Sequence, residues 1–431
     1  MLVAVFIGSM LAGIVIGLPI AMALLLCAVC TALYMGGGDA NATIFARTIM
    51  QGTDSVTMMA LPFFMLAGEV MNRGGLTKRI IDFCNIFVGR LRGGLGYVTI
   101  LACLMFASLV GSAVAACAAL GAILIPLMAD SGYDRVKAAA LTASANLVAP
   151  IMPPSVPMII YGIAAGVSIK SLFMGGIAPA VYLTIVASVV WFFVSRKKGA
   201  VPDVTNVPRP TLKEVVKVLS TGMWALFLPI IILVGLRSGY FTATEAGVIA
   251  CVYGIVVGML VYRELNFKDL AKSFVSAAKM SAVVMFLAAT ANAAAYFMTI
   301  SRIPQMLTSG LEGLVENPTL LMVVLMLIVA VVGLAMDVVP SILILTPIML
   351  PLVKAAGIDP VYFGIVFVLM NVLGLTSPPV GPILNVACAT GKVKMDEIIL
   401  PTMPYFIAQV TLCFLLAIFP ALIEVPLGWL L

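Results

Sequence analysis

Residues 371–382 read Asn-Val-Leu-Gly-Leu-Thr-Ser-Pro-Pro-Val-Gly-Pro, and residues 146–157 read Asn-Leu-Val-Ala-Pro-Ile-Met-Pro-Pro-Ser-Val-Pro. Both stretches begin with asparagine, carry a proline pair at the same place and end on proline. Residues 371–382 lie 225 positions after residues 146–157, and at this offset 13 of the 57 positions from Ile123 to Pro179 are identical without a gap. The chain therefore contains two halves of common origin.

The composition is that of a membrane protein. Of the 431 residues, 63% are apolar and only 10% are charged, and many apolar stretches reach the length of a bilayer crossing. We therefore expect an all-α polytopic membrane protein with lipids around it. In such proteins, duplicated halves meet at a transport site.

Charge and residue usage exclude several function classes. The net charge of +6 is carried by short segments between apolar runs, so it indicates orientation in the membrane and no nucleic-acid partner. The chain has no histidine, its eight cysteines are scattered, and no Walker motif occurs. A histidine-based zinc site, a Ser-His-Asp triad and ATP use by this chain are not expected, so the sequence does not indicate an enzyme.

The equivalent loops of the two halves differ in charge. Asp134 is followed by Arg135 and Lys137 in the first half, whereas Asp359 is followed by Pro360 and Tyr362 in the second. By the positive-inside rule the two loops face opposite sides of the membrane, which predicts inverted repeats. Most other basic clusters can be cytoplasmic in the same arrangement, and Arg302 and Lys354 are the exceptions.

The apolar pattern predicts the elements of each half. The first inverted repeat, 1–195, is expected to hold scaffold crossings within 1–72 (2–17, 19–35 and 56–72), a surface arm at 73–92, a re-entrant hairpin at 94–129, an interrupted helix at 137–165 and a crossing at 171–195. Gly17-Leu18-Pro19 leaves open whether 2–35 is one kinked helix or two. A cytoplasmic linker is expected at 196–217. The second repeat, 218–431, is expected to hold crossings at 219–236, 246–262, 281–298 and 400–428, arms at 264–279 and 300–317, a hairpin at 319–353 and an interrupted helix at 361–388.

The hairpin tips and the interrupted helices are the candidate sites. Non-helical backbone at membrane depth is tolerated only where it is buried in protein or lines a wet cavity. Its freed carbonyls suit a cation, and the adjoining helix N-termini suit an anion. Sodium fits better than calcium because the interrupted stretches carry almost no carboxylate. Asp337 is the one carboxylate at an expected tip, where it is either a functional group or the N-cap of the second leg.

Six motifs are spread over essentially the whole chain. They are Leu61-Pro62-Phe63-Phe64-Met65-Leu66-Ala67-Gly68-Glu69, Gly93-Gly94-Leu95-Gly96-Tyr97, Gly111-Ser112-Ala113-Val114-Ala115, Pro153-Pro154-Ser155, Thr244-Glu245-Ala246-Gly247 and Ser377-Pro378-Pro379-Val380-Gly381. Together they resemble the large membrane subunit of TRAP (tripartite ATP-independent periplasmic) transporters.

The resemblance implies a function and partners. It implies a sodium-driven elevator importer of the ion-transporter superfamily in the bacterial inner membrane, carrying organic acids such as sialic acid, sugar acids, keto acids or C4-dicarboxylates. It also implies a soluble periplasmic substrate-binding protein and a small four-helix membrane subunit on a separate chain. Two or more sodium ions are expected.

The resemblance also implies site residues. The expected sodium ligands are Ser108, Gly111, Ser112, Asn146, Ala149, Pro150, Gly333, Asp337, Asn371, Gly374 and Thr376. Ser155, Ser341, Ser377 and Gly381 are the expected substrate-binding residues. One position departs from the family pattern: Ala116 stands where members commonly have aspartate.

Three other functions fit parts of the pattern. A single-component sodium–dicarboxylate symporter would have the same repeats and need no binding protein. A sodium–proton antiporter would titrate a buried carboxylate, for which Asp337 is almost the only candidate. A membrane enzyme is the alternative from a different class, and no nucleophile–base pair at recognisable spacing supports it.

Overall fold

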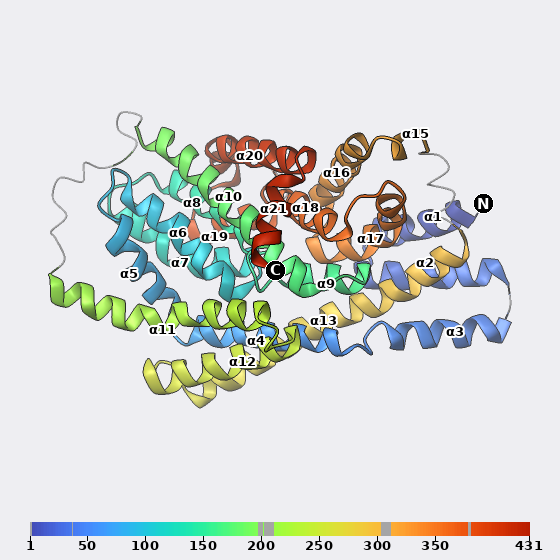
Figure 1. Ribbon diagram of the computed structural model, residues 1–431, viewed down its shortest axis with the longest axis horizontal. Coiled ribbons are helices and arrows are strands. Elements are labelled where there is room, and N and C mark those ends of the chain that lie inside the picture. The colour runs from blue at the N-terminus through green and yellow to red at the C-terminus, as the bar shows by residue number, and fades with distance from the viewer. Residues whose placement is uncertain (1, 37, 197–200, 202–210, 303–311, 378–380) are drawn as a thin grey trace.

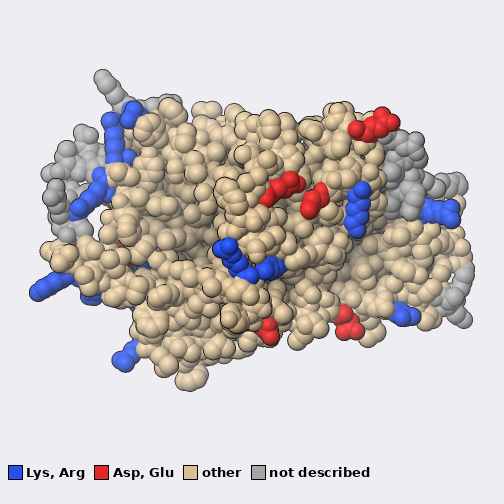
Figure 2. All heavy atoms as spheres, in the orientation of Figure 1, with Lys and Arg blue, Asp and Glu red and all other residues tan. Residues whose placement is uncertain are grey.

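The computed structural model describes residues 2–36, 38–196, 201, 211–302, 312–377 and 381–431. Within these residues all regular structure is helical (Figure 1). Seven of the described helices are long and apolar enough to cross a membrane, and a bent pair, 41–51 with 56–73, makes an eighth candidate. The expected all-α polytopic fold is confirmed. Figure 2 accordingly shows a face on which most side chains are uncharged.

The first half contains ten α-helices and two short 3-10 turns. They are α1 (Leu2–Val15), α2 (Ile20–Met35), α3 (Gly38–Gln51), η1 (Val56–Met59), α4 (Ala60–Arg73), α5 (Leu76–Val88), α6 (Gly94–Val110), α7 (Ala113–Asp130), α8 (Arg135–Ala145), η2 (Asn146–Val148), α9 (Val156–Ala165) and α10 (Ile169–Arg196). The segment 2–35 forms two helices, α1 and α2, that pack against each other. Gly17 between them has a φ of 87°, and Pro19 precedes α2.

The second half follows the same order. Its described elements are α11 (Leu212–Arg237), α12 (Ala243–Val256) with its π-helical end η3 (Val257–Val261), α13 (Phe267–Ile300), α15 (Glu312–Val315), α16 (Pro318–Ala335), α17 (Val338–Ala355), α18 (Pro360–Leu373), η4 (Gly374–Thr376), α19 (Pro382–Gly391), α20 (Met395–Ile418) and α21 (Ala421–Leu430). Half of the expected arm at 300–317, residues 303–311, lies outside the described residues.

Three expectations about these elements are wrong. The arm at 264–279 and the crossing at 281–298 form one continuous helix, α13, because no glycine or proline interrupts 267–300. The crossing at 400–428 is divided into α20 and α21 beside Pro420. The linker 196–217 ends earlier, because α11 begins at Leu212 behind a capping box of Thr211 and Glu214. The helix α3 was not anticipated.

The boundaries of the two halves correspond. Both α7 and α17 have 18 residues and begin 225 positions apart, and so do α8 and α18. Asp134 and Asp359 cap α8 and α18 in the same way, each accepting hydrogen bonds from two backbone N–H groups at the helix start. The repeat in sequence is thus accompanied by a repeat in local structure.

The halves interlock reciprocally. The hairpin helix α7 packs along α19, and its counterpart α17 packs along α9. In the same manner α8 packs on α20 and α18 on α10, while α4 packs on α12 and α13 on α2. Contacts exchanged in this way are typical of two halves related by an approximate two-fold axis.

The helices form two groups (Figure 1). One group, α2, α3, α4, α11, α12 and α13, lies along the lower side in that view, and the hairpins and interrupted helices lie above it. The two groups touch where Gly68 of α4 packs against α6. The approach is close, since a methyl group added at Gly68 would lie 3.3 Å from the carbonyl oxygen of Leu109. The candidate site thus belongs to the upper group.

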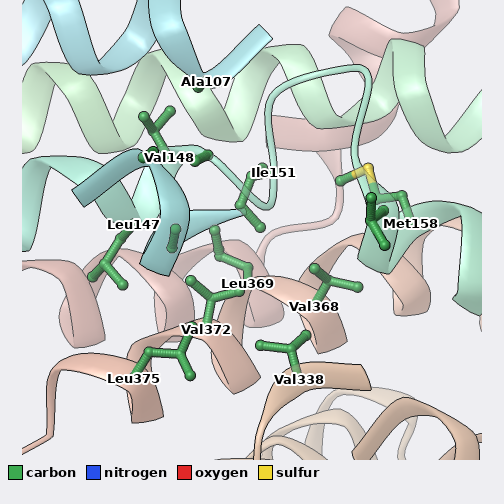
Figure 3. Packing of buried hydrophobic residues seen from close by; sticks show 14 of the residues in the cluster. Ala107, Leu147, Val148, Ile151, Met158, Val338, Val368, Leu369, Val372 and Leu375 are labelled. Carbon is green, nitrogen blue, oxygen red and sulfur yellow. The ribbon is translucent and has the colours of Figure 1, made fainter. Parts of the chain in front are cut away.

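An apolar contact joins the two interrupted helices at the centre. Figure 3 shows Ile151 of the first pointing toward Leu369 of α18, while Val148 points to Ala107 of α6. All of these side chains are buried. Burying each side chain of this kind stabilises the folded state by roughly 1.5–3 kcal/mol, so the two interrupted helices are held in one packed unit.

Candidate ion and substrate site

The first hairpin tip rests directly on the first interruption. α6 ends at Gly111, whose φ of 62° is the left-handed conformation that favours glycine. A methyl group added at Gly111 would lie 2.8 Å from the carbonyl oxygen of Pro154. Ser112 follows and caps α7 by accepting a hydrogen bond from the Ala115 N–H. Only a glycine allows this approach of two backbones.

The first interruption is bridged by one hydroxyl. Ser155 is fully buried, accepts a hydrogen bond of 3.2 Å from the Met158 N–H and donates one to the carbonyl oxygen of Pro150. It therefore caps α9 and ties the beginning of the stretch to its end. Ala149 and Pro150 are buried beside it. Ser155, predicted as a substrate ligand, has both hydrogen-bonding functions engaged within the protein.

Asn146 has a hydrogen-bond partner for only one of the two polar atoms of its side chain. Its side chain is fully buried, and its amide nitrogen donates a hydrogen bond of 2.8 Å to the carbonyl oxygen of Thr142. Its amide oxygen has no partner. Ser108 on α6 is also buried, and its hydroxyl donates to the Met105 carbonyl at 2.6 Å, which leaves its oxygen free to accept. An unpartnered acceptor in the interior costs about 1–3 kcal/mol unless a ligand or water reaches it.

The second hairpin approaches its interruption through Gly333, in the last turn of α16. A methyl group added there would lie 2.9 Å from the Asn371 carbonyl oxygen, and one added at Gly374 would overlap the Gly333 carbonyl. Asn371 is fully buried, and neither its amide oxygen nor its amide nitrogen has a partner. Gly333, Asn371 and Gly374, all predicted sodium ligands, are thus brought together.

The other predicted residues of the second half fall around this contact. Thr376 is buried and donates to the Leu373 carbonyl, and Ser377 donates to the Gly374 carbonyl at 2.7 Å. Gly381 lies against the Leu375 carbonyl. Pro378, Pro379 and Val380 lie outside the described residues.

Asp337 lies in different surroundings from Asn371. It is exposed between α16 and α17, and its carboxylate accepts a hydrogen bond of 2.7 Å from the Val338 N–H. This hydrogen bond supports the interpretation of Asp337 as the N-cap of α17. Ser341, one turn later, is buried and donates to the Asp337 carbonyl oxygen at 2.8 Å.

Sequence reasoning missed four buried polar residues with unpartnered atoms: Ser144, Thr346, Tyr405 and Gln409. Gln409 of α20 reaches α8, where its amide nitrogen donates to the Ser144 carbonyl at 3.0 Å. The available signal was a polar side chain inside an otherwise apolar stretch. Ala116, at the position that departs from the family pattern, is fully buried in α7.

Other recurring motifs have structural roles. Gly247 of α12 packs against Phe63 of α4, and Thr244 donates to the Val56 carbonyl at 3.0 Å. Glu245 forms a capping box with Thr242 at the start of α12, in which the carboxylate accepts from the Thr242 N–H and the Thr242 hydroxyl accepts from the Glu245 N–H. These contacts fix α12 to α4 away from the interruptions.

No acidic metal cluster accompanies the site. The residues that the structure describes contain no group of three or more Cys, Asp or Glu side chains placed to hold a metal ion. Their ion pairs are Arg73–Glu69, Arg79–Glu264 and Lys272–Asp269, none of which involves a predicted site residue. The oxygens at the interruptions are neutral apart from Asp337.

The chain matches the family described as "Tripartite ATP-independent periplasmic transporter, DctM component" over residues 7–422. The chain belongs to this family. The DctM component is a membrane permease, and the chain is accordingly a multi-pass protein of the bacterial inner membrane. Its relatives in the family are named as transporter permease components and not as enzymes.

Two relatives of this DctM chain match it from end to end. A putative TRAP transporter large permease protein of Haemophilus influenzae is 45% identical over 430 residues, covering 100% of both chains. The 2,3-diketo-L-gulonate TRAP transporter large permease protein YiaN of Escherichia coli is 44% identical over 433 residues, again covering 100% of both. The crystal structure of the Alcanivorax borkumensis YdaH transporter has a TM-score of 0.67 at 16% identity, covering 91% of this chain and 90% of that one, which shows a shared fold.

Proposed function

We propose that the chain imports an organic acid together with sodium ions, as the large membrane subunit of a tripartite transporter. The observation that carries this proposal is the pair Asn146 and Asn371. These asparagines occupy equivalent positions of the two interrupted helices, and each keeps an unpartnered amide oxygen in the interior. Neutral oxygens beside unwound backbone are the ligands that transporters use for sodium.

Each interruption would hold one sodium ion against its hairpin. The first would be bound by oxygens of Ser108, Gly111, Ser112, Asn146, Ala149 and Pro150. The second would be bound by oxygens of Gly333, Asn371, Gly374 and Thr376, with Asp337 reached by a movement of the second tip. The close approach of Gly111 to Pro154 and of Gly333 to Asn371 supports this grouping.

The substrate would bind where helices begin beside these ions. The N-termini of α9, α17 and α19 carry partial positive charge, and Ser155, Ser341, Ser377 and Gly381 lie at or near them. The Escherichia coli relative is named for 2,3-diketo-L-gulonate, so a sugar acid of this kind is the first candidate. Sialic acid and C4-dicarboxylates are the next.

Transport would proceed by an elevator movement. Residues 1–195 and 218–431 would be inverted repeats, in keeping with the reciprocal packing of their helices. The hairpins and interrupted helices, which meet at Ile151 and Leu369, would slide as one unit against α1–α5 and α11–α13. Each net positive charge carried inward gains about 2.3 kcal/mol per 100 mV of membrane potential.

Two partners complete the proposed transporter. The family description "tripartite" and the word "component" support two further proteins beside this chain. We infer that these are a small four-helix membrane subunit and a soluble periplasmic binding protein that delivers the acid.

Reconstitution tests the proposal. The chain and its small subunit are placed in liposomes, and uptake of radiolabelled 2,3-diketo-L-gulonate, sialic acid and succinate is measured under a sodium gradient, with and without the binding protein. We expect uptake of one acid that requires both sodium and the binding protein. Sodium-driven uptake without that protein would instead establish a single-component symporter, and uptake indifferent to sodium would refute the coupling.

A further inference from the structure

A basic trough runs along the first turns of α13. It has a volume of about 520 Å³ and is lined by Lys268, Ala271, Lys272, Val275, Ser276 and Lys279. Counted from Lys268, the other positions lie 3, 4, 7, 8 and 11 residues further on, so all six share a single face of the helix. Three of the six side chains are lysines.

The trough carries excess positive charge. Asp269 lies near it and pairs with Lys272 at 3.0 Å. Within the described part of the chain, no ion pair involves Lys268 or Lys279. Two ammonium groups are therefore available to a ligand with negative charge.

The surroundings of the trough are apolar. Phe267, Phe274 and Val275 are exposed by 79%, 49% and 55%. Large apolar side chains interleaved with lysines are typical of a helix face at a membrane interface, where lysine stems lie along hydrocarbon and their ammonium groups reach the headgroups.

The length of α13 places the trough at headgroup level. Its 34 residues extend over about 51 Å at 1.5 Å per residue, which exceeds the hydrocarbon thickness of about 30 Å. Residues 281–300 carry no charge and are long enough to span that thickness. The lysines, which precede this segment, then lie beside the phosphates of one leaflet.

We propose that this trough binds an anionic phospholipid. Lys268 holds the phosphate group, an acyl chain runs over Val275 and the stem of Lys279, and the ammonium group of Lys279 reaches back to the headgroup region. The bilayer supplies phosphate at this depth, whereas a protein covering the face would need acidic side chains to match the two available ammonium groups.

Lipid selectivity tests the site directly. The chain, purified with its small subunit, is placed in micelles containing equal amounts of phosphatidylglycerol and phosphatidylcholine, and retained lipids are counted by native mass spectrometry. We expect phosphatidylglycerol to be preferred by the wild type. Substitutions Lys268→Gln, Lys272→Gln and Lys279→Gln together should abolish the preference, since a lysine near a membrane surface contributes roughly a fivefold factor.

Matched variants show whether the lipid preference depends on these three lysines or on the overall positive charge of the chain. Lys213→Gln, Lys217→Gln and Lys354→Gln together remove three other exposed lysines and should leave the preference intact. Lysine-to-arginine substitutions at 268, 272 and 279 should also retain it. An unchanged lipid preference after the glutamine substitutions overturns the proposal. If those substitutions instead release the small subunit while phosphatidylglycerol is retained, the trough binds that protein and the proposal is also overturned.

Discussion

The two places where a hairpin meets an interrupted helix share a plan but differ in how far their polar groups are satisfied. In the first, Ser155 bridges the interruption with two hydrogen bonds and Asn146 keeps one of its amide bonds. In the second, Asn371 has no partner on either amide atom. The first region is held together by its own bonds, whereas the second depends more on a ligand.

The most damaging change should be Gly374→Ala in the second region. Its added methyl group would overlap the Gly333 carbonyl, and two backbones cannot both yield. We expect destabilisation of about 3 kcal/mol and loss of sodium-driven uptake. Thermal unfolding and uptake in liposomes measure the two effects. Gly8→Ala, with open space around it, is the control, and equal behaviour of the two variants would contradict the close contact.

Asn371→Leu should separate stability from ion binding. Leucine removes two unsatisfied buried atoms, each costing about 1–3 kcal/mol, so the sodium-free protein should be at least as stable as the wild type. Sodium should raise the Tm of the wild type but not that of the variant, since only a protein that binds the ion is stabilised by it. A full sodium-induced shift in the variant would remove Asn371 from the proposed ligands.

Ser155→Ala and Ser377→Ala should lower the free energy of unfolding by different amounts, because they remove different numbers of hydrogen bonds. Ser155 makes two hydrogen bonds and Ser377 donates one. We expect destabilisation of about 2 kcal/mol for the first and about 1 kcal/mol for the second, measured by denaturation of the reconstituted protein. A larger loss at Ser377 would reverse the comparison of the two regions.

Asn146→Leu should have a smaller effect on sodium-free stability than Asn371→Leu. It removes one unpartnered oxygen but also breaks the hydrogen bond to Thr142, so the two contributions nearly cancel. The sodium-induced Tm shift should fall, because the first ion loses a ligand. A gain in sodium-free stability equal to that of Asn371→Leu would show that the two regions are equally unsatisfied.

Asp337→Asn should have the smallest effect. Asparagine caps a helix about as well as aspartate, and the position is exposed, so stability should change by less than about 0.5 kcal/mol. Loss of an exposed charge near a cation costs roughly 1 kcal/mol, or about a fivefold weaker sodium affinity. A loss above about a hundredfold, or sodium flux driven by pH that the substitution abolishes, would mean that this carboxylate turns inward.

The interruptions were predictable because proline and glycine act locally. Pro150, Pro153 and Pro154 remove backbone donors, and no continuous helix can form across them. The end of α6 at the first hairpin tip also has a local cause, since Gly111 adopts a conformation that other residues avoid. Helix boundaries set by a single residue's chemistry can be found in one sequence.

What could not be predicted depends on contacts between distant segments. The exposure of Asp337 and the complete lack of partners at Asn371 follow from how α16, α17 and α18 pack, and the apolar pattern carries no trace of either. For α13 the sequence signal was present but misleading. The composition changes from basic to apolar at Lys279, which suggested a helix boundary, whereas the helix is continuous there. Gln409 bonds to Ser144 across 265 positions, and although a polar side chain in an apolar stretch marks Gln409, nothing local identifies its partner.

The reciprocal packing of the halves has a consequence for biosynthesis. The partner of α7 is α19 and the partner of α9 is α17, so the first half leaves the ribosome before any surface that completes it exists. Its hairpin and interrupted helix can pack on each other, but the faces that α17 and α19 cover must be shielded by the insertion machinery or by water until some 190 further residues have been synthesised. A chain cut in the segment 202–210 and expressed as two polypeptides should regain its fold only when both pieces are made in the same cell.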